Sequence, residues 1–147
     1  FQEGLAKAGH APAEVVRTSF NRSGGYEAGL KLAARIKSAC EGGGEAAGPK
    51  LCIFAVNDVM AIGASAALRA EGLRIPRDAT IAGFDDIETL RDFRPALSTV
   101  RLPLEEIGRL ATRATARPSE SSGDGEEDGQ QPVTGEVTLR RSTEAVA

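Results

Sequence analysis

Cysteine, histidine and tryptophan are scarce in this 147-residue chain, which contains two, one and none of them, respectively. The two cysteines, Cys40 and Cys52, fall at a predicted helix end and inside a predicted buried strand. This placement suits neither a zinc site nor a disulfide framework. We therefore expect two ordinary reduced thiols, and we predict neither a metal nor a cofactor.

Long apolar runs and clusters of basic residues are also missing. No stretch approaches the roughly 20 apolar residues that a membrane-spanning helix needs, so no membrane partner is expected. Lysine and arginine occur at most in pairs and the net charge is -3, which gives this chain no electrostatic footprint for DNA. No nucleophile beside a base and no G-x-G-x-x-G loop is apparent, so the chain is not expected to be an enzyme.

What the sequence does contain is centred on residues 51–72, LCIFAVNDVMAIGASAALRAEG. Residues 51–56 lack polar alternation, which is typical of a strand covered on both faces in a parallel sheet. The strand ends at Asn57 and Asp58, which we call the first corner. A helix with apolar residues at helical spacing follows and stops at Gly72, and either corner residue can cap it. This order of elements predicts an α/β fold.

A second apolar strand, residues 80–84, stops in the same way at Asp85 and Asp86, which we call the second corner. Ligands of open α/β sheets bind outside the carboxyl ends of the strands. If the two strands are neighbours, the two corners therefore form one site. Acid–base or metal chemistry at the second corner is disfavoured, because adjacent residues on an extended segment point to opposite sides.

The remaining elements are placed by periodicity, capping residues and composition. In chain order they are a helix tail over 1–8, a strand over 14–20, a helix from Ser23 to about Cys40, a loop over 41–50, an extended piece over 97–101, a helix beginning at Pro103, an acidic mobile loop over 118–132, and a short strand around Val137 and Leu139. One domain is the default for this length. Because the chain opens within a helix, we expect a further segment upstream of Phe1.

Five ordered segments give the chain a resemblance to a known family. They are SGGYEAG, AVNDVMAIGASAALRAEGLRIPRD, IAGFDDI, PALSTVRLPLEEIGRLA and LRRST. With these segments the chain resembles the effector-sensing domain of the lactose-repressor and purine-repressor (LacI/GalR-type) family of bacterial transcription regulators. That family has a helix-turn-helix headpiece and two α/β subdomains of periplasmic-binding-protein type, which are joined by three crossings and bind a small molecule between them.

The resemblance implies a three-layer αβα parallel sheet, here the C-terminal subdomain, with most of the N-terminal subdomain absent. It divides the chain into the ligand-sensing subdomain (1–101), a crossing and helix of the missing N-terminal subdomain (102–117), the acidic loop (118–132), and a final strand with its tail (133–147). The implied function is sensing of an effector, expected to be a sugar, that modulates DNA binding by the missing headpiece of a cytoplasmic repressor. A periplasmic sugar-binding protein of a transporter is the alternative with the same fold, and an upstream signal peptide would favour it.

The resemblance places three residues in the effector site. Asn57 matches a position that hydrogen-bonds the effector, Asp85 matches one whose carboxylate contacts it, and Phe20 matches one whose ring lines the pocket. The alternatives are a helix cap for Asn57 and core packing for Phe20. Asp58 is expected to cap its own helix or to orient Asn57, and Asp86 is expected to be structural.

The resemblance also implies a homodimer. The expected contact lies on the helix that carries Ile62 and on the irregular segment with Leu90 and Phe93. The alternative for Phe93 is a ring that folds back onto its own sheet. The helix after Pro103 is expected to expose apolar residues, because its partner belongs to the missing subdomain. Leu102 departs from the family pattern, in which a polar amide is common before the proline.

Overall fold

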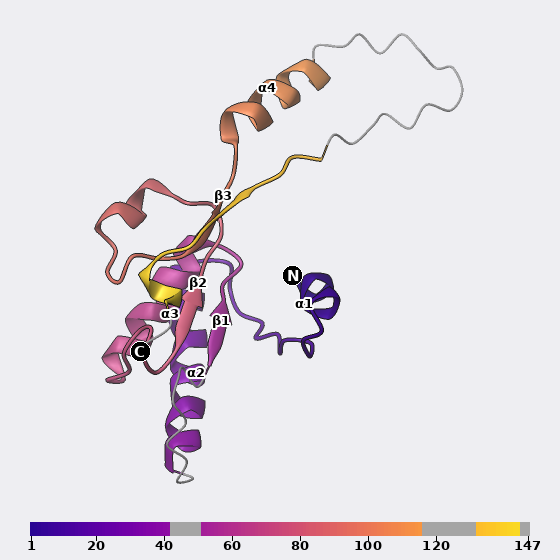
Figure 1. Cartoon of the computed structure of the whole chain (residues 1–147). Helices are drawn as coiled ribbons and strands as arrows, with labels where there is room; N and C mark the ends of the chain where they lie inside the picture. The colour runs from indigo at the N-terminus through magenta and orange to yellow at the C-terminus, as the bar shows by residue number, and fades with distance from the viewer. Residues whose placement is uncertain (42–50, 116–131, 145–147) are drawn as a thin grey trace.

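The computed structural model describes residues 1–41, 51–115 and 132–144 (Figure 1). The elements in chain order are helices α1 (Gln2–Lys7) and α2 (Arg22–Glu41), strand β1 (Cys52–Phe54), helix α3 (Asp58–Ala70), strand β2 (Thr80–Ala82), the 3-10 turn η1 (Glu88–Asp92), strand β3 (Thr99–Arg101), helix α4 (Leu104–Thr115), strand β4 (Glu136–Thr138) and the 3-10 turn η2 (Arg141–Thr143). The predicted loop 41–50 beyond its first residue, and the predicted acidic loop 118–132 up to residue 131, lie outside the described residues. None of the described helices is both long and apolar enough to cross a bilayer.

The two strands that end in corners are direct neighbours. β1 pairs with β2 in parallel, with Ile53 opposite Ile81. The chain before β3 continues this parallel arrangement, because the Gly83 N–H donates to the Ser98 carbonyl at 2.9 Å. β3 itself pairs antiparallel with β4. The predicted α/β architecture with parallel strands is therefore confirmed.

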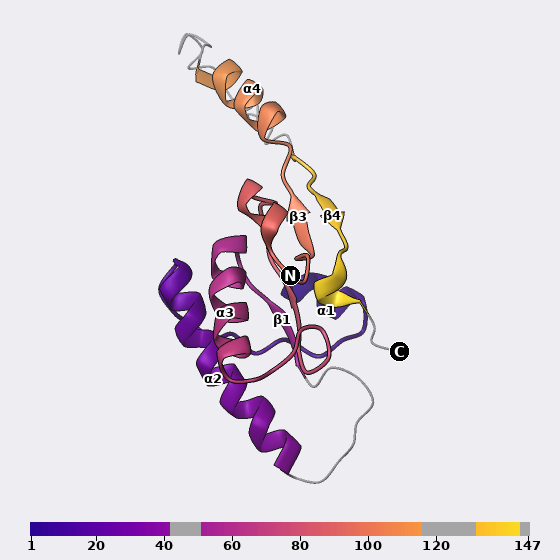
Figure 2. The same ribbon diagram turned by 90° about the vertical axis from the view of Figure 1, so that its left-hand side faces the viewer.

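Helices α2 and α3 pack side by side and bury the apolar face of the sheet (Figures 1 and 2). One cluster joins α3 to the sheet through Ala61, Ala64 and Ile81, and a second cluster joins both helices through Ile36 and Leu68. These side chains are 4% exposed or less. Burial of this kind contributes about 25 cal/mol per Å² of apolar surface, so the two helices and the sheet form the stable body of the chain.

Glycines let α2 and α3 approach at backbone distance. A Cβ atom at Gly25 would collide with the Met60 carbonyl, and one at Gly63 would collide with the Arg22 carbonyl. The first turns of the two helices therefore lie against each other. This contact gives a physical reason for the glycines in SGGYEAG and for the small residues of α3.

Residues 14–20 do not form the predicted strand. They have no regular secondary structure, no strand pairs with them in the described parts of the chain, and Val15 and Phe20 are 67% and 73% exposed. Branched residues fit a strand only when a neighbouring strand supplies a ladder. Here the segment is held by side chains instead, including a Glu14–Arg35 ion pair of 2.7 Å.

Two further expectations need correction. Cys52 is exposed rather than buried, because β1 has β2 on one side and no strand on its other side among residues 1–41, 51–115 and 132–144. Ser23 does not cap α2. The helix begins one residue earlier, and the Asn21 side-chain oxygen accepts a hydrogen bond from the Gly24 N–H at 2.8 Å.

Helix α4 stands away from the body at the end of β3 and β4 (Figures 1 and 2). It begins at Leu104, one residue after the expected Pro103, whose carbonyl accepts from the Ile107 N–H at 3.0 Å. Leu104 is 66% exposed, and Ile107 and Leu110 are only half-buried. The expectation of an apolar helix face without a full partner is therefore confirmed, whereas its assignment to a second subdomain stays a prediction. We call α4 the arm, and the β3–β4 pair joins it to the body.

Candidate functional site

The two corners meet at the carboxyl edge of the sheet. The backbone N–H of Asp58 donates to the Phe84 carbonyl at 2.8 Å, which joins the start of α3 directly to the segment after β2. The two polar strand ends therefore lie next to each other at this edge. This is the arrangement that the sequence predicted for neighbouring strands.

Asn57 caps α3. Its side-chain oxygen accepts from the Met60 N–H at 2.8 Å, and the residue is 8% exposed. Capping uses the carbonyl of the amide and leaves the NH2 group, which has no hydrogen bond to any described residue. The capping alternative is thus correct, and it remains compatible with the predicted role as a hydrogen-bond donor to an effector.

Asp85 has an unusual backbone conformation at the second corner. Its φ is 108°, and its N–H donates to the Val100 carbonyl at 3.0 Å. Its carboxylate makes no hydrogen bond within the described chain, and the residue is half-buried. A positive φ is costly for a residue with a side chain, so the surrounding contacts hold the Asp85 backbone in this conformation.

Phe20 lies at the same end of the molecule. It precedes α2 by two positions, and the first turn of α2 contacts that of α3, which Asn57 caps. Its ring is 73% exposed, so the core-packing alternative does not describe it. The role of Phe20 in the effector site stays a prediction.

Asp58 has a role that sequence reasoning missed. The side chain is fully buried, and it accepts from the Thr99 hydroxyl at 2.7 Å and from the Ile87 N–H at 3.0 Å. Burial raises the pKa of Asp58, and the nearby charge of Asp85 acts in the same direction, whereas the two hydrogen bonds oppose the shift. Asp58 does not cap its own helix, because Asn57 is the N-cap and the Asp58 carboxylate connects α3 to β3 and to the segment after β2. The alternative, that Asp58 orients Asn57, stays a prediction. No local spacing signals this contact, since Thr99 is 41 positions away.

Asp86 is structural, as expected, but its partners were not foreseen. Its carboxylate accepts from Arg101 Nε and from Arg140 Nη2, each at 2.7 Å, with one arginine on each oxygen. Burial alone would raise the pKa of Asp86, but the hydrogen bonds and charges of the two arginines outweigh it and lower the pKa below its usual value. We call Asp86, Arg101 and Arg140 the Asp86 clamp.

The predicted dimer residues lie together on the side of α3 and η1. Leu90 is 5% exposed and belongs to the core, where it has little surface left for a partner. Ile62 and Phe93 are half-buried against the same core cluster. The Arg69 guanidinium lies 4.9 Å from the centre of the Phe93 ring. The Phe93 ring therefore packs in part against its own body, as the alternative prediction stated.

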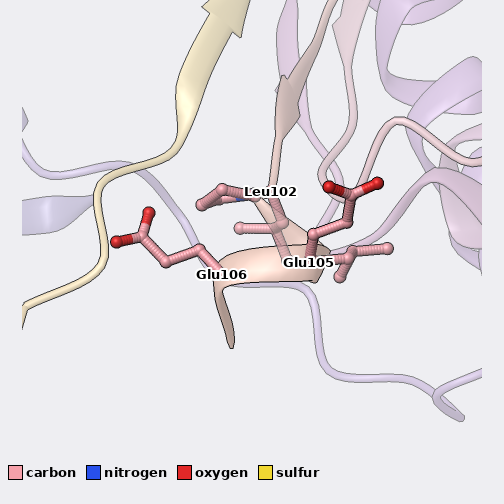
Figure 3. A pocket seen from close by; sticks show the side chains of 5 residues that line it. Leu102, Glu105 and Glu106 are labelled. Carbon is pink, nitrogen blue, oxygen red and sulfur yellow. The ribbon is translucent and has the colours of Figure 1, made fainter. Parts of the chain in front are cut away.

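A shallow pocket lies at the start of α4 (Figure 3). It is lined by five consecutive residues, 102–106, and the carboxylates of Glu105 and Glu106 point away from each other. A single segment forms its walls, so it is a surface depression at the root of the arm. Leu102 lines it, directly after Arg101, which contacts the second corner. In the parts of the chain that the structure describes, no three His, Cys, Asp or Glu residues are placed to hold a metal ion.

Comparisons with known proteins agree with this geometry. The family described as periplasmic binding protein-like domain matches residues 1–143. The HTH-type transcriptional repressor PurR of Haemophilus influenzae is 30% identical over 136 residues, which are 92% of this chain and 37% of that protein. This relative is a transcriptional repressor rather than an enzyme.

Solved structures give the same answer. A LacI family transcriptional regulator from an Arthrobacter species, in complex with lactose, is 28% identical with a TM-score of 0.69, over 97% of this chain and 48% of that one. One from Enterococcus faecalis with bound ribose is 25% identical with a TM-score of 0.71, over 99% of this chain and 49% of that one. The chain thus spans about half the length of these regulators or less. It belongs to the periplasmic binding protein-like domain family, in the form that serves LacI/GalR-type regulators as their effector-binding domain.

Proposed function

We propose that this chain is the C-terminal part of the sensing domain of a LacI-type transcription regulator, and that it contributes one wall of a sugar site. The observation that carries the proposal is the meeting of the two corners, which brings Asn57 and Asp85 to one edge of the sheet. The sugar-bound regulators of similar fold support a sugar as the ligand class.

The chemistry of these residues suits a sugar. The Asp85 carboxylate accepts short charge-assisted hydrogen bonds from neighbouring hydroxyl groups. The NH2 group of Asn57 donates to a ring or hydroxyl oxygen, because capping occupies only the amide oxygen. The exposed ring of Phe20 offers an apolar surface for the C–H face of a sugar ring. In this proposal the opposite wall comes from a second subdomain, which α4 joins.

The regulatory output follows from differential binding. A sugar that binds one arrangement of the two subdomains better than another shifts the population toward it. In the proposed regulator, this shift changes DNA binding by a helix-turn-helix headpiece outside this chain, in the cytoplasm. A periplasmic sugar-binding protein remains the second candidate, and the coding sequence upstream of Phe1 separates the two by its headpiece or its signal peptide.

The test uses the complete gene product that contains this chain. Titration calorimetry with ribose, lactose and a purine base should show binding of a sugar. Asp85→Ala should weaken that binding about tenfold or more, because one charge-assisted contact is lost. Asp92→Ala is the matched control, since Asp92 is an exposed aspartate on η1. Binding of the purine alone, or equal affinity of the Asp85→Ala protein and its parent, would overturn the proposed site.

We also propose that the complete regulator is a homodimer through the surface around Ile62 and Phe93, with Leu90 as its support from the core. Phe93 is half-buried, which leaves part of its ring for a partner. Phe93→Asp should raise the dimer dissociation constant in sedimentation experiments, whereas Leu139→Asp, at a residue that directly follows β4 and is 77% exposed, should not. Equal dissociation of both variants would place the contact elsewhere.

A further inference from the structure

The Asp86 clamp joins two strands that are far apart in sequence to one carboxylate. Arg101 is the last residue of β3, where the chain leaves for α4, and Arg140 follows β4, where the chain returns. Each arginine donates to its own oxygen of Asp86 at 2.7 Å. Both roots of the arm are therefore tied to the second corner.

The clamp combines a buried acceptor with accessible donors. The Asp86 side chain is 9% exposed, whereas those of Arg140 and Arg101 are 24% and 54% exposed. Arg140 is further fixed by a hydrogen bond from its Nη1 to the Leu97 carbonyl at 2.9 Å. The Asp86 carboxylate is thus held by the body, and its hydrogen bonds set the orientation of the two guanidinium groups.

The clamp residue Asp86 is next to Asp85, the residue proposed to bind the effector. Asp85 and Asp86 are consecutive and both have positive φ values, 108° and 56°. A non-glycine pair in this conformation persists only where surrounding contacts hold it. Those contacts include the clamp, the Asp85 N–H bond to the Val100 carbonyl of β3, and the Asp86 N–H bond to the Thr99 hydroxyl at 3.4 Å. A movement of the Asp85 backbone therefore also moves the clamp.

We infer that Asp86 is a positioning residue that holds the arm in one direction relative to the sheet, so that the placement of α4 depends on the corner that carries Asp85. The clamp itself follows from the contacts within this chain. Its use for reporting an effector at Asp85 rests on the proposed function. The inference assigns to Asp86, Arg101 and Arg140 a role in the geometry of the arm that is distinct from stabilising the body.

The first experiment measures the direction of the arm without any ligand. Spin labels at Lys31→Cys on α2 and Arg113→Cys on α4, in a Cys40→Ser and Cys52→Ser background, report one distance across the chain by double electron–electron resonance. The parent should give one narrow peak, and Asp86→Asn should give a distribution about twice as wide or a second peak, as expected when a hinge contact is lost. A distribution that superimposes on that of the parent overturns the inference.

Two variants keep this experiment decisive. Arg101→Gln removes only the more exposed arginine and leaves the Arg140 contact, so the body should fold, and its distribution should widen in the same direction. Arg91→Gln is the matched control, because it removes an exposed arginine whose partner Glu88, at 3.3 Å, lies on the same short turn. A purely stabilising role would lower the unfolding temperature of Asp86→Asn without widening the distribution, and this result would also overturn the inference.

The second experiment repeats the distance measurement in the complete gene product with ribose and with lactose. A sugar that binds the parent should shift its peak, whereas Asp86→Asn should bind that sugar and lose most of the shift. An equal shift in both proteins would show that the clamp does not couple effector binding to the orientation of the arm. If neither sugar binds the parent, the proposed function fails, and the ligand-free measurement still decides whether the clamp holds the arm.

Discussion

The first and second corners each end a parallel strand with a polar pair, and each contains one buried carboxylate, but the two carboxylates are stabilised differently. Asp58 accepts hydrogen bonds from neutral donors, the Thr99 hydroxyl and the Ile87 N–H. Asp86 accepts from two guanidinium groups. As a result, the pKa of Asp58 is raised mainly by burial, whereas that of Asp86 is lowered by its arginines despite burial.

This difference separates a rigid part of the molecule from a movable part. Loss of the Asp58 carboxylate leaves buried donors that water cannot easily reach, so the body becomes less stable. Loss of the Asp86 carboxylate leaves arginines that are partly solvated, so the cost in stability is smaller. We therefore expect Asp58 in the first corner to stabilise the body, and Asp86 in the second corner to set the orientation of the arm.

The largest expected effect is at Asp58. Asp58→Ala should lower the free energy of unfolding by about 3 kcal/mol, because the buried Thr99 hydroxyl and the Ile87 N–H both lose their acceptor. Urea denaturation of the 147-residue chain measures this change. Asp58→Asn is the matched control, since it keeps the size and one acceptor oxygen and should cost less. Equal losses for Ala and Asn would contradict this expectation and show that the second acceptor oxygen, which both variants lack, sets the cost rather than side-chain volume.

The next effect concerns Asn57. Asn57→Ala removes the cap of α3 and should cost about 1 kcal/mol of stability. Asn57→Asp keeps a capping oxygen but removes the NH2 group, so it should preserve stability while weakening sugar binding by the complete protein. Denaturation and calorimetry on both variants separate the two roles. If Asn57→Asp binds sugar as the parent does, the amide is a cap and nothing more.

A smaller change in stability is expected at Asp85. Asp85→Gly should change the free energy of unfolding by less than about 1 kcal/mol, because relief of the positive φ offsets the greater flexibility of glycine. Asp92→Gly in the exposed η1 turn is the comparison for the glycine effect alone. A loss of several kcal/mol at Asp85 would make it a structural residue like Asp58, and the contrast within the second corner would disappear.

The smallest effect is the pH dependence, where the two carboxylates act with opposite sign. Asp86 has a folded pKa below its ordinary value of 3.8, so its stabilisation is present above that value and is lost as the pH falls through the folded pKa. Asp58 has a raised folded pKa, so the folded state binds its proton more tightly and stability rises as the pH falls toward the ordinary value. Denaturation midpoints between neutral and acidic pH should fall more steeply for Asp58→Asn than for the parent. Parallel profiles would contradict the opposite signs.

Local patterns predicted much of the body. The apolar run before Asn57, the helix up to Gly72 and the strand before Asp85 all appear near their predicted positions, because each depends on residues that are close in sequence. The predicted strand at 14–20 failed for the complementary reason. A strand needs a neighbour, and the described chain supplies none to this segment.

Apart from the failed strand at 14–20, the sequence by itself determined the order of strands and helices and the two polar corners. It predicted a common edge only if the two strands were neighbours, since a parallel pair of strands presents its carboxyl ends together, and the structure supplied that pairing. Only the tertiary structure decided which corner residue serves which purpose. The contacts of Asp58 with Thr99 and of Asp86 with Arg140 span 41 and 54 positions. No local spacing encodes such contacts, because they depend on how β3 and β4 pass the second corner rather than on the residues that adjoin it.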